Sequence, residues 1–207
     1  MPNCTMESWT RRFGQGFPPK PHFFLESGSG KPETKLTVHK MAYLSLGSNM
    51  GDRMANLREA IARLGRLGQV VAISSFYETE PVEFAAQPWF LNCVVQLDTE
   101  KMPRQLLRGV LDIESKMGRR RILKKGPRLI DIDILLFGSS IVSVKGLTIP
   151  HAAMHTRRFV LEPLAEIAPE ARHPGLKRTV RELRDELPPG QTVRKTGVAP
   201  QPAAGQR

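Results

Sequence analysis

The chain has 207 residues, of which 40% are hydrophobic, and its formal net charge is +11. This length is enough to bury one core of ordinary size, so we expect a single folded domain. The charge favours anionic ligands such as nucleotides, polyphosphates, nucleic acid or acidic lipid. About half of it lies in residues 1–40 and 188–207, which weakens an argument for nucleic-acid binding from charge alone.

Cysteine content and hydropathy exclude several classes of protein. The two cysteines, Cys4 and Cys93, are too few for a disulfide framework or a zinc site. Cys93 lies in an apolar run and is predicted to be a small buried residue. No stretch approaches about eighteen apolar residues, and the N-terminus lacks the layout of a signal peptide. We therefore expect a soluble protein of the reducing cytoplasm, with no membrane association.

The two ends of the chain differ in composition from its middle. Residues 1–40 are rich in Gly, Pro, Ser and Lys and show no sustained period, which predicts a disordered extension. Residues 188–207 contain mainly Pro, Gly, Gln and Ala with no apolar face, which predicts a disordered tail. The folded domain is therefore expected to span residues 41–187.

The first half of this domain alternates between strand and helix patterns. Residues 42–46 form a short apolar run, typical of a strand, and residues 57–67 place apolar side chains at helical spacing. Residues 70–77 are β-branched and aromatic and predict a second strand. Residues 90–97 predict a third strand after a loop that contains two prolines.

The second half completes a recognisable order of elements. Residues 106–117 predict an amphipathic helix and residues 129–137 a strand, which gives the order βαββαβ. That order is typical of an α+β, ferredoxin-like core, an antiparallel sheet with both helices on one face. Residues 159–167 predict a short C-terminal helix, and the capping-box pattern of residues 179–182 begins another. We expect both to pack around the edge of the core.

Two carboxylates on the strand over residues 129–137 are the most informative feature. Asp131 and Asp133 share one face of that strand, with Cα atoms roughly 6–7 Å apart, and the isoleucines beside them point the other way. Without a partner, each aspartate would raise the pKa of the other. Mg²⁺ typically takes one or two carboxylates together with phosphate oxygens and water. The alternative is a pair of solvent-facing aspartates, each paired with a nearby arginine.

A basic segment lies directly before these aspartates. Residues 118–128 carry six Lys and Arg and no acidic residue. Arginine supplies forked donors for phosphate oxygens, and lysine supplies a mobile point charge. A polyphosphate chain on Mg²⁺ held by the aspartates would lie within reach of this segment. The alternatives are a solvated loop or an RNA contact.

Three weaker signals suggest further contacts. Gly47 ends the first strand just before a helix, where backbone N–H groups can meet an anion or the edge of a ligand. Phe90 and Asn92 share a face of their strand and suit a flat heterocycle, although a core Phe beside a satisfied Asn is equally compatible. His151 could contact phosphate or move a proton, or could be structural.

In this order, these segments resemble the 6-hydroxymethyl-7,8-dihydropterin pyrophosphokinases of folate biosynthesis. The resemblance covers about residues 42–167, and its most specific portions are residues 46–49, 87–92, 126–134 and 149–151, followed by Arg157 and Phe159. It implies transfer of pyrophosphate from ATP to the hydroxymethyl group of the pterin, with release of AMP. It further implies small-molecule substrates, no nucleic acid and no obligate protein partner.

The resemblance also implies a set of site residues. Asp131 and Asp133 match the pair that holds two Mg²⁺ ions on the phosphates of ATP. The implied catalytic residues are Arg119, Arg121, Asp131 and Asp133. The implied ATP-binding residues are Glu114, Arg128, Ile134, His151 and Arg157. The implied pterin-binding residues are Gly47, Thr79, Val82, Phe90, Asn92 and Phe159.

The chain departs from the family pattern at several positions. Glu80 replaces a common proline near the pterin pocket, and Phe90 lacks a tyrosine hydroxyl. Lys125 stands where an aromatic residue often precedes Gly-Pro-Arg, and Ala152 stands where an aromatic residue is frequent. The segment over residues 121–126 is one residue shorter than in other members.

Two other functions are compatible with parts of this pattern. A nucleic-acid binding module can combine a ferredoxin-like sheet with basic loops, but it should show stacked aromatics on adjacent strands and needs no paired carboxylates. A metal-dependent phosphohydrolase could use the same aspartates, and would release phosphate from ATP without a pterin.

Overall fold

The computed structural model describes residues 38–81, 87–118 and 126–196. The chain divides into two compact units, Met1–Leu36 and Thr37–Arg207, and every described residue belongs to the second. The predicted extension over residues 1–40 lies outside the described residues, except for its last three.

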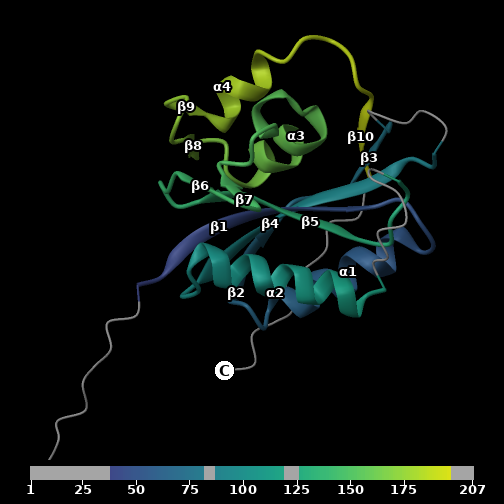
Figure 1. Cartoon of the computed structure of the whole chain (residues 1–207). Helices are drawn as coiled ribbons and strands as arrows, with labels where there is room; N and C mark the ends of the chain where they lie inside the picture. The colour runs from purple at the N-terminus through teal and green to yellow at the C-terminus, as the bar shows by residue number, and fades with distance from the viewer. Residues whose placement is uncertain (1–37, 82–86, 119–125, 197–207) are drawn as a thin grey trace, which may run out of the picture. The chain divides into compact units, whose positions relative to one another are not determined.

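The secondary structure follows the expected alternation and then adds a C-terminal part (Figure 1). The first part consists of β1 (Lys40–Ser48), α1 (Arg53–Leu64), β2 (Gln69–Ile73), β3 (Tyr77–Thr79), β4 (Phe90–Thr99), α2 (Pro103–Lys116) and β5 (Asp131–Phe137). The second part consists of β6 (Val142–Val144), β7 (Leu147–Ile149), the 3₁₀ helix η2 (Met154–Thr156), α3 (Arg158–Ile167), β8 (Arg172–His173), β9 (Arg178–Thr179), α4 (Val180–Asp185) and β10 (Val193–Lys195).

The main sheet is antiparallel, as the sequence predicts. Its strands follow the order β10-β3-β4-β1-β5, and β2 also pairs with β4. All five pairings are antiparallel, and β1 is hydrogen-bonded to β4 on one side and to β5 on the other. The α+β class is therefore confirmed, and the central strand β1 lies between the two strands that carry the candidate site residues.

The single strand predicted over residues 70–77 is wrong, because the chain forms β2 and β3 there. Between them, the Ser74 N–H donates to Val94 O at 2.9 Å, while the Val94 N–H donates to Ser74 Oγ at 2.9 Å. A side-chain oxygen thus replaces a backbone acceptor of the ladder. The apolar and β-branched pattern continues across this interruption, so it could not indicate where the strand breaks.

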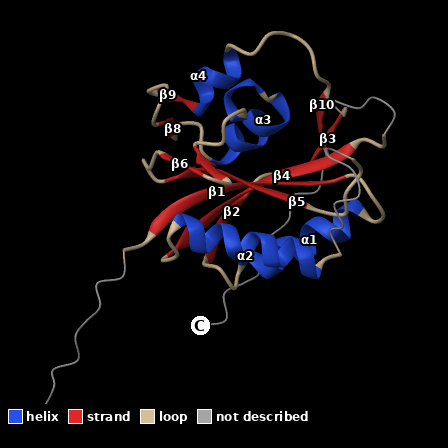
Figure 2. Cartoon of the chain, in the orientation of Figure 1, coloured by secondary structure: helices blue, strands red, loops and turns tan. Residues whose placement is uncertain are grey.

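Helices cover both faces of the sheet (Figure 2). α1 and α2 lie together on one face, as predicted, and bury residues such as Leu57 and Val110 against it. α3 and α4 lie over the opposite face instead of around the edge, and they pack against Leu135 and Leu136 of β5. Ile132 and Ile134 of the same strand belong to the cluster under α1 and α2, so β5 is covered by apolar side chains on both faces.

Local signals explain where two of the helices begin. Asp52 Oδ1 accepts the Ala55 N–H at 2.9 Å and caps α1. At α4, Thr179 Oγ1 accepts from the Glu182 N–H at 3.2 Å, and Glu182 Oε2 accepts from the Thr179 N–H at 2.7 Å. The predicted capping box is therefore confirmed.

Cys93 is fully buried, as expected of a small apolar residue.

The predicted disordered tail is wrong for residues 188–196, and residues 197–207 lie outside the described part. β10 pairs with β3 at Val193↔Thr79 through Lys195↔Tyr77. A backbone ladder needs no apolar face, which is why the composition of this segment did not predict it. Within the described ranges, no helix has the length and apolar character needed to cross a membrane.

Candidate functional site

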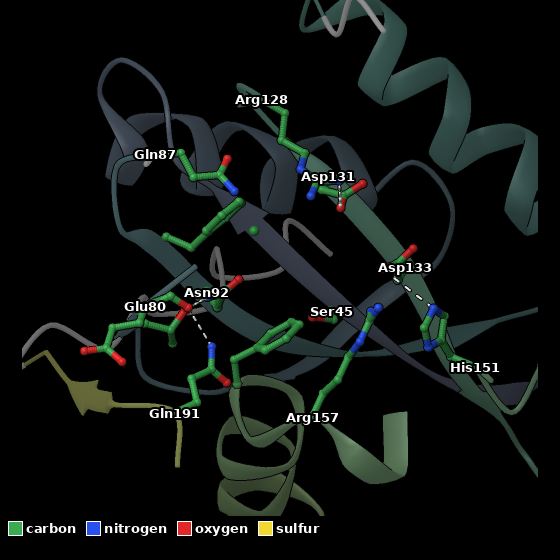
Figure 3. Close-up of a pocket in the computed structure, with 14 residues that line it drawn as sticks. Ser45, Glu80, Gln87, Asn92, Arg128, Asp131, Asp133, His151, Arg157 and Gln191 are labelled. Carbon is green, nitrogen blue, oxygen red and sulfur yellow. Dashed lines mark hydrogen bonds and ion pairs between the residues drawn. The ribbon is translucent and has the colours of Figure 1, made fainter. Parts of the chain in front are cut away.

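A pocket of about 300 Å³ opens beside the central strands of the sheet (Figure 3). Strands β1, β3, β4 and β5 contribute to its wall, together with α3 and the segment before β10. Its lining residues are Ser45, Gly47, Thr79, Glu80, Gln87, Phe90, Asn92, Arg128, Asp131, Asp133, His151, Arg157, Phe159 and Gln191.

The two aspartates lie on one face of β5, as the alternation predicts. The side chains of Asp131 and Asp133 are 22% and 44% exposed, whereas Ile132 and Ile134 between and beyond them are each 5% exposed. Arg128 Nη1 donates to Asp131 Oδ2 at 2.6 Å. The carboxylates therefore face the pocket beside a guanidinium group, while the isoleucines fill the core.

His151 approaches the second aspartate. Its Nε2 lies 4.0 Å from Asp133 Oδ2, and its backbone N–H donates to Leu135 O at 2.9 Å. The Ala153 N–H donates to His151 Nδ1 at 3.3 Å, which assigns the proton of the neutral ring to Nε2. Burial lowers the pKa of His151, and the charge of Asp133 opposes this shift. The ring thus favours its neutral form with its N–H toward the aspartate.

The segment that precedes β5 is held by the turn after β1. The Arg128 N–H donates to Asn49 Oδ1 at 2.8 Å, and the Asn49 N–H donates to Arg128 O at 3.2 Å. Asn49 Nδ2 also donates to Gln87 Oε1 at 3.1 Å. Asn49 is almost fully buried, so this turn positions Arg128 by joining three loops.

The opposite half of the pocket, here called the uncharged half, is lined mainly by Thr79, Phe90, Asn92 and Phe159. Asn92 is 3% exposed and its Nδ2 donates to Thr79 Oγ1 at 2.8 Å. Phe90 and Phe159 line the same half. The guanidinium carbon of Arg128 lies 5.6 Å from the centre of the Phe90 ring, and that of Arg157 lies 5.6 Å from the centre of the Phe159 ring. Two aromatic rings and an oriented amide suit a planar polar heterocycle.

Gly47 joins the two halves of the pocket. On the central strand it pairs with Asn92 of β4 and with Asp131 of β5. A Cβ atom added at Gly47 would lie 2.7 Å from Asn92 Oδ1, closer than such contacts normally allow. The close approach of backbone and amide therefore requires glycine at this position.

Substitution of Gly47 by alanine tests this packing. We expect Gly47→Ala to displace the Asn92 amide, break its hydrogen bond to Thr79 and raise the KM for a ligand bound beside Asn92 about tenfold, the cost of one or two lost hydrogen bonds. The KM for a ligand bound beside the aspartates should change little. Gly175→Ala, whose added Cβ would make ordinary contacts with His173, is the matched control. Equal KM values in both variants would contradict the role given to Gly47.

The structure brings together most of the predicted site residues. Those that line the pocket are Gly47, Thr79, Phe90, Asn92, Arg128, Asp131, Asp133, His151, Arg157 and Phe159. Glu114 and Ile134 do not line it: Glu114 is 2% exposed on α2, and the Ile134 side chain lies in the core. Val82, Arg119, Arg121, Lys124 and Lys125 lie outside the described residues.

Four lining residues were not among the predicted site residues: Ser45, Gln87, Gln191 and Glu80, which the sequence indicated only as a departure from the family pattern. Ser45 lies two residues before Gly47 on the same strand, so alternation could have placed it on the same face. Gln87 belongs to one of the segments that carry the resemblance. Gln191 lies in the segment predicted to be disordered, and no sequence signal pointed to it.

The donor set fits a cation that also binds phosphate. Among residues 38–81, 87–118 and 126–196, no three or more His, Cys, Asp and Glu side chains gather in a group able to hold a metal ion. A pair of carboxylates on one strand face is nevertheless the number that Mg²⁺ commonly takes from protein when phosphates and water complete its shell.

Comparison with known proteins identifies the family. The family model described as 7,8-dihydro-6-hydroxymethylpterin-pyrophosphokinase (HPPK) matches residues 43–169. The chain belongs to the HPPK family. The resemblance first noted in separate motifs thus extends over one continuous match.

Individual relatives agree with this membership. One relative is the 2-amino-4-hydroxy-6-hydroxymethyldihydropteridine pyrophosphokinase of Methylorubrum extorquens. It is 46% identical over 150 residues, which cover 72% of this HPPK-family chain and 94% of the relative. The enzyme of the same name from Bacillus subtilis is 44% identical over 132 residues, 63% of this chain and 79% of its own length. The folic acid synthesis protein fol1 of Schizosaccharomyces pombe is 40% identical over 168 residues, 80% of this chain.

Larger relatives contain more than this chain. The matched region is 23% of the S. pombe protein and 25% of the Dictyostelium discoideum protein FOL1, so the chain spans about a quarter of each. A crystal structure of Plasmodium falciparum HPPK-DHPS, in a triple-mutant form, superimposes with a TM-score of 0.61 at 20% identity. It covers 74% of this chain and 45% of the solved chain, and shows a shared fold.

Proposed function

We propose that this chain transfers a pyrophosphoryl group from ATP to the hydroxymethyl group of 6-hydroxymethyl-7,8-dihydropterin, in folate biosynthesis, and releases AMP. The observation that carries this proposal is one pocket with two unlike halves: Asp131, Asp133 and Arg128 on one side, and Asn92 with aromatic rings on the other. Such a pocket suits a polyphosphate and a flat heterocycle side by side. The names of the similar curated proteins support the same reaction.

The charged half is proposed to hold the nucleotide. Asp131 and Asp133 would hold two Mg²⁺ ions, which when bound neutralise negative charge on the phosphates of ATP. Arg128, Arg157 and His151 line this side and can donate hydrogen bonds to phosphate oxygens. Arg119 and Arg121, outside the described residues, are proposed to add charge from the basic segment.

Glu114 and Ile134 are proposed to support the nucleotide side indirectly. Glu114 Oε1 accepts the Ile132 N–H at 2.7 Å, at the residue between the two aspartates. Ile134 packs in the core beneath the same strand. Both residues therefore fix the position of β5. We assign them a positioning role, in which their side chains do not contact ATP directly.

The uncharged half is proposed to hold the pterin between Phe90 and Phe159. The Asn92 amide would meet the polar edge of the ring, and Thr79 orients that amide. Gly47 and Val82 are proposed to complete this site. The order β1-α1-β2-β3-β4-α2-β5, in which β2 and β3 both pair with β4 in the place of one strand, and the antiparallel pairing support the proposal that the core is ferredoxin-like.

The reaction needs placement more than covalent participation by the protein. The hydroxymethyl oxygen attacks the β-phosphorus of ATP, the bond between the β-phosphorus and its bridging oxygen to the α-phosphorus breaks, and AMP leaves with that oxygen. The hydroxyl proton is released. We propose that in-line positioning and stabilisation of spreading negative charge are the dominant contributions. We further propose that the protein acts in the cytoplasm without an obligate protein partner.

Release of AMP from ATP and Mg²⁺, measured with and without the pterin, tests this function. We expect AMP only when the pterin is present. Release of inorganic phosphate without pterin would instead identify a phosphohydrolase. Folded protein that yields neither product, but binds single-stranded RNA, would favour the nucleic-acid alternative.

A further inference from the structure

The segment around β10 forms part of the pocket wall, although it is distant in sequence from the other lining residues. It is fixed to the domain at several points. Lys195 Nζ lies 2.9 Å from Glu166 Oε1 on α3. The backbone N–H and the hydroxyl of Thr196 both donate to Phe76 O, at 2.8 and 2.9 Å. These anchors hold the segment beside β3, next to the uncharged half of the pocket.

Glu80, which lines the pocket, makes further contacts with this segment. The Glu80 N–H donates to Thr192 O at 3.3 Å, and Glu80 Oε2 accepts the Thr192 N–H at 3.3 Å. A proline at this position would have no N–H to donate and no carboxylate. In this chain, both the backbone and the side chain of residue 80 therefore bind the C-terminal segment.

These contacts bring the side chain of Gln191 to the pocket. Gln191 Nε2 donates to Glu80 O at 2.7 Å, and Gln191 is a lining residue. Figure 3 places it near Glu80 and Asn92, across the pocket from Asp133 and His151. It thus belongs to the half of the pocket assigned to the heterocycle.

We propose that Gln191 is a specificity-determining residue for the pterin. The inference rests on the proposed function, because it assigns a contact to the acceptor substrate of that reaction. A neutral amide carries both donors and an acceptor, which suits the mixed edge of a pterin ring. A phosphate would instead favour the cationic side of the pocket. Anchored by β10, the amide adds a second polar side chain to the part of the pocket that holds Asn92 and Thr79.

Steady-state kinetics and binding of two Gln191 variants test the proposal. Gln191→Ala should raise the KM for the pterin about three- to tenfold, the loss of one neutral hydrogen bond, with the KM for ATP and kcat unchanged within twofold. Gln191→Glu, which keeps the length but loses the donors, should behave similarly. Arg181→Ala, which removes an exposed ion pair with Glu170 that does not line the pocket, should stay within twofold of wild type in all three constants.

Calorimetric titration with the pterin separates this inference from the proposed function. The titration uses an ATP analogue with a methylene bridge between the α- and β-phosphorus, so that the pterin can bind without reacting. Wild type that binds pterin in this titration but forms no AMP from ATP in the kinetic assay would overturn the reaction, while a weaker affinity in Gln191→Ala would still support the contact. An unchanged affinity and KM for the pterin would overturn the role of Gln191. Equal losses for pterin and ATP would also overturn it, because they indicate a general structural effect.

Discussion

Asp133→Ala is expected to lower kcat by roughly a thousandfold or more, with little change in the midpoint of thermal unfolding. The side chain is 44% exposed and faces the pocket, so its loss should remove a proposed ligand for Mg²⁺ without opening a cavity in the core. The measurement is the initial rate of pterin-dependent AMP formation at saturating ATP and Mg²⁺.

A surface aspartate provides the matched control for this change. Asp112 on α2 is 57% exposed and pairs with Lys116 at 2.7 Å. Asp112→Ala should leave kcat within twofold, since an exposed ion pair contributes little to folding and lies away from the pocket lining. If Asp133→Ala matched this control in kcat, the assignment of the β5 carboxylates to metal binding would be wrong.

Glu114→Ala is expected to reduce both stability and activity. Glu114 is 2% exposed and accepts the buried Ile132 N–H at 2.7 Å, so the alanine would leave that N–H unsatisfied. The free energy of unfolding should fall by about 1–3 kcal/mol, as measured by urea denaturation. Because Ile132 lies between Asp131 and Asp133, kcat should also fall at temperatures where the variant remains folded.

Two variants distinguish the hydrogen bond from a general effect of substitution. Glu114→Gln keeps an oxygen acceptor and should recover much of the lost stability and kcat. Glu59→Ala, at a residue that is 52% exposed on α1, should change stability by no more than about 0.5 kcal/mol. A Glu114→Gln variant as unstable as Glu114→Ala would show that the hydrogen bond to Ile132 is not the main contribution.

The charged side of the site followed from the sequence because it depends on local geometry. Alternation along β5 alone places Asp131 and Asp133 on one face, and the burial of Ile132 and Ile134 agrees. The approach of Asn92 to Gly47, by contrast, depends on the register between β1 and β4. Spacing along one strand cannot give that register, and the resemblance to a family was needed to bring these residues together.

The parts of the fold that the sequence did not predict depend on tertiary contacts. The pattern of α3 and α4 shows which side of each helix is apolar but not which face of the sheet it meets. β10 forms because the edge of β3 and Glu80 offer hydrogen-bonding partners, none of which is visible in the composition of residues 188–196. Gln191 enters the pocket for the same reason.

The most direct test of the proposed function is the identity of the phosphorylated pterin, determined by mass spectrometry after incubation with ATP and Mg²⁺. We expect a pterin that carries both the β- and γ-phosphoryl groups, formed together with an equal amount of AMP. A pterin that carries a single phosphoryl group with ADP as the other product, or an unmodified pterin beside consumed ATP, would contradict it.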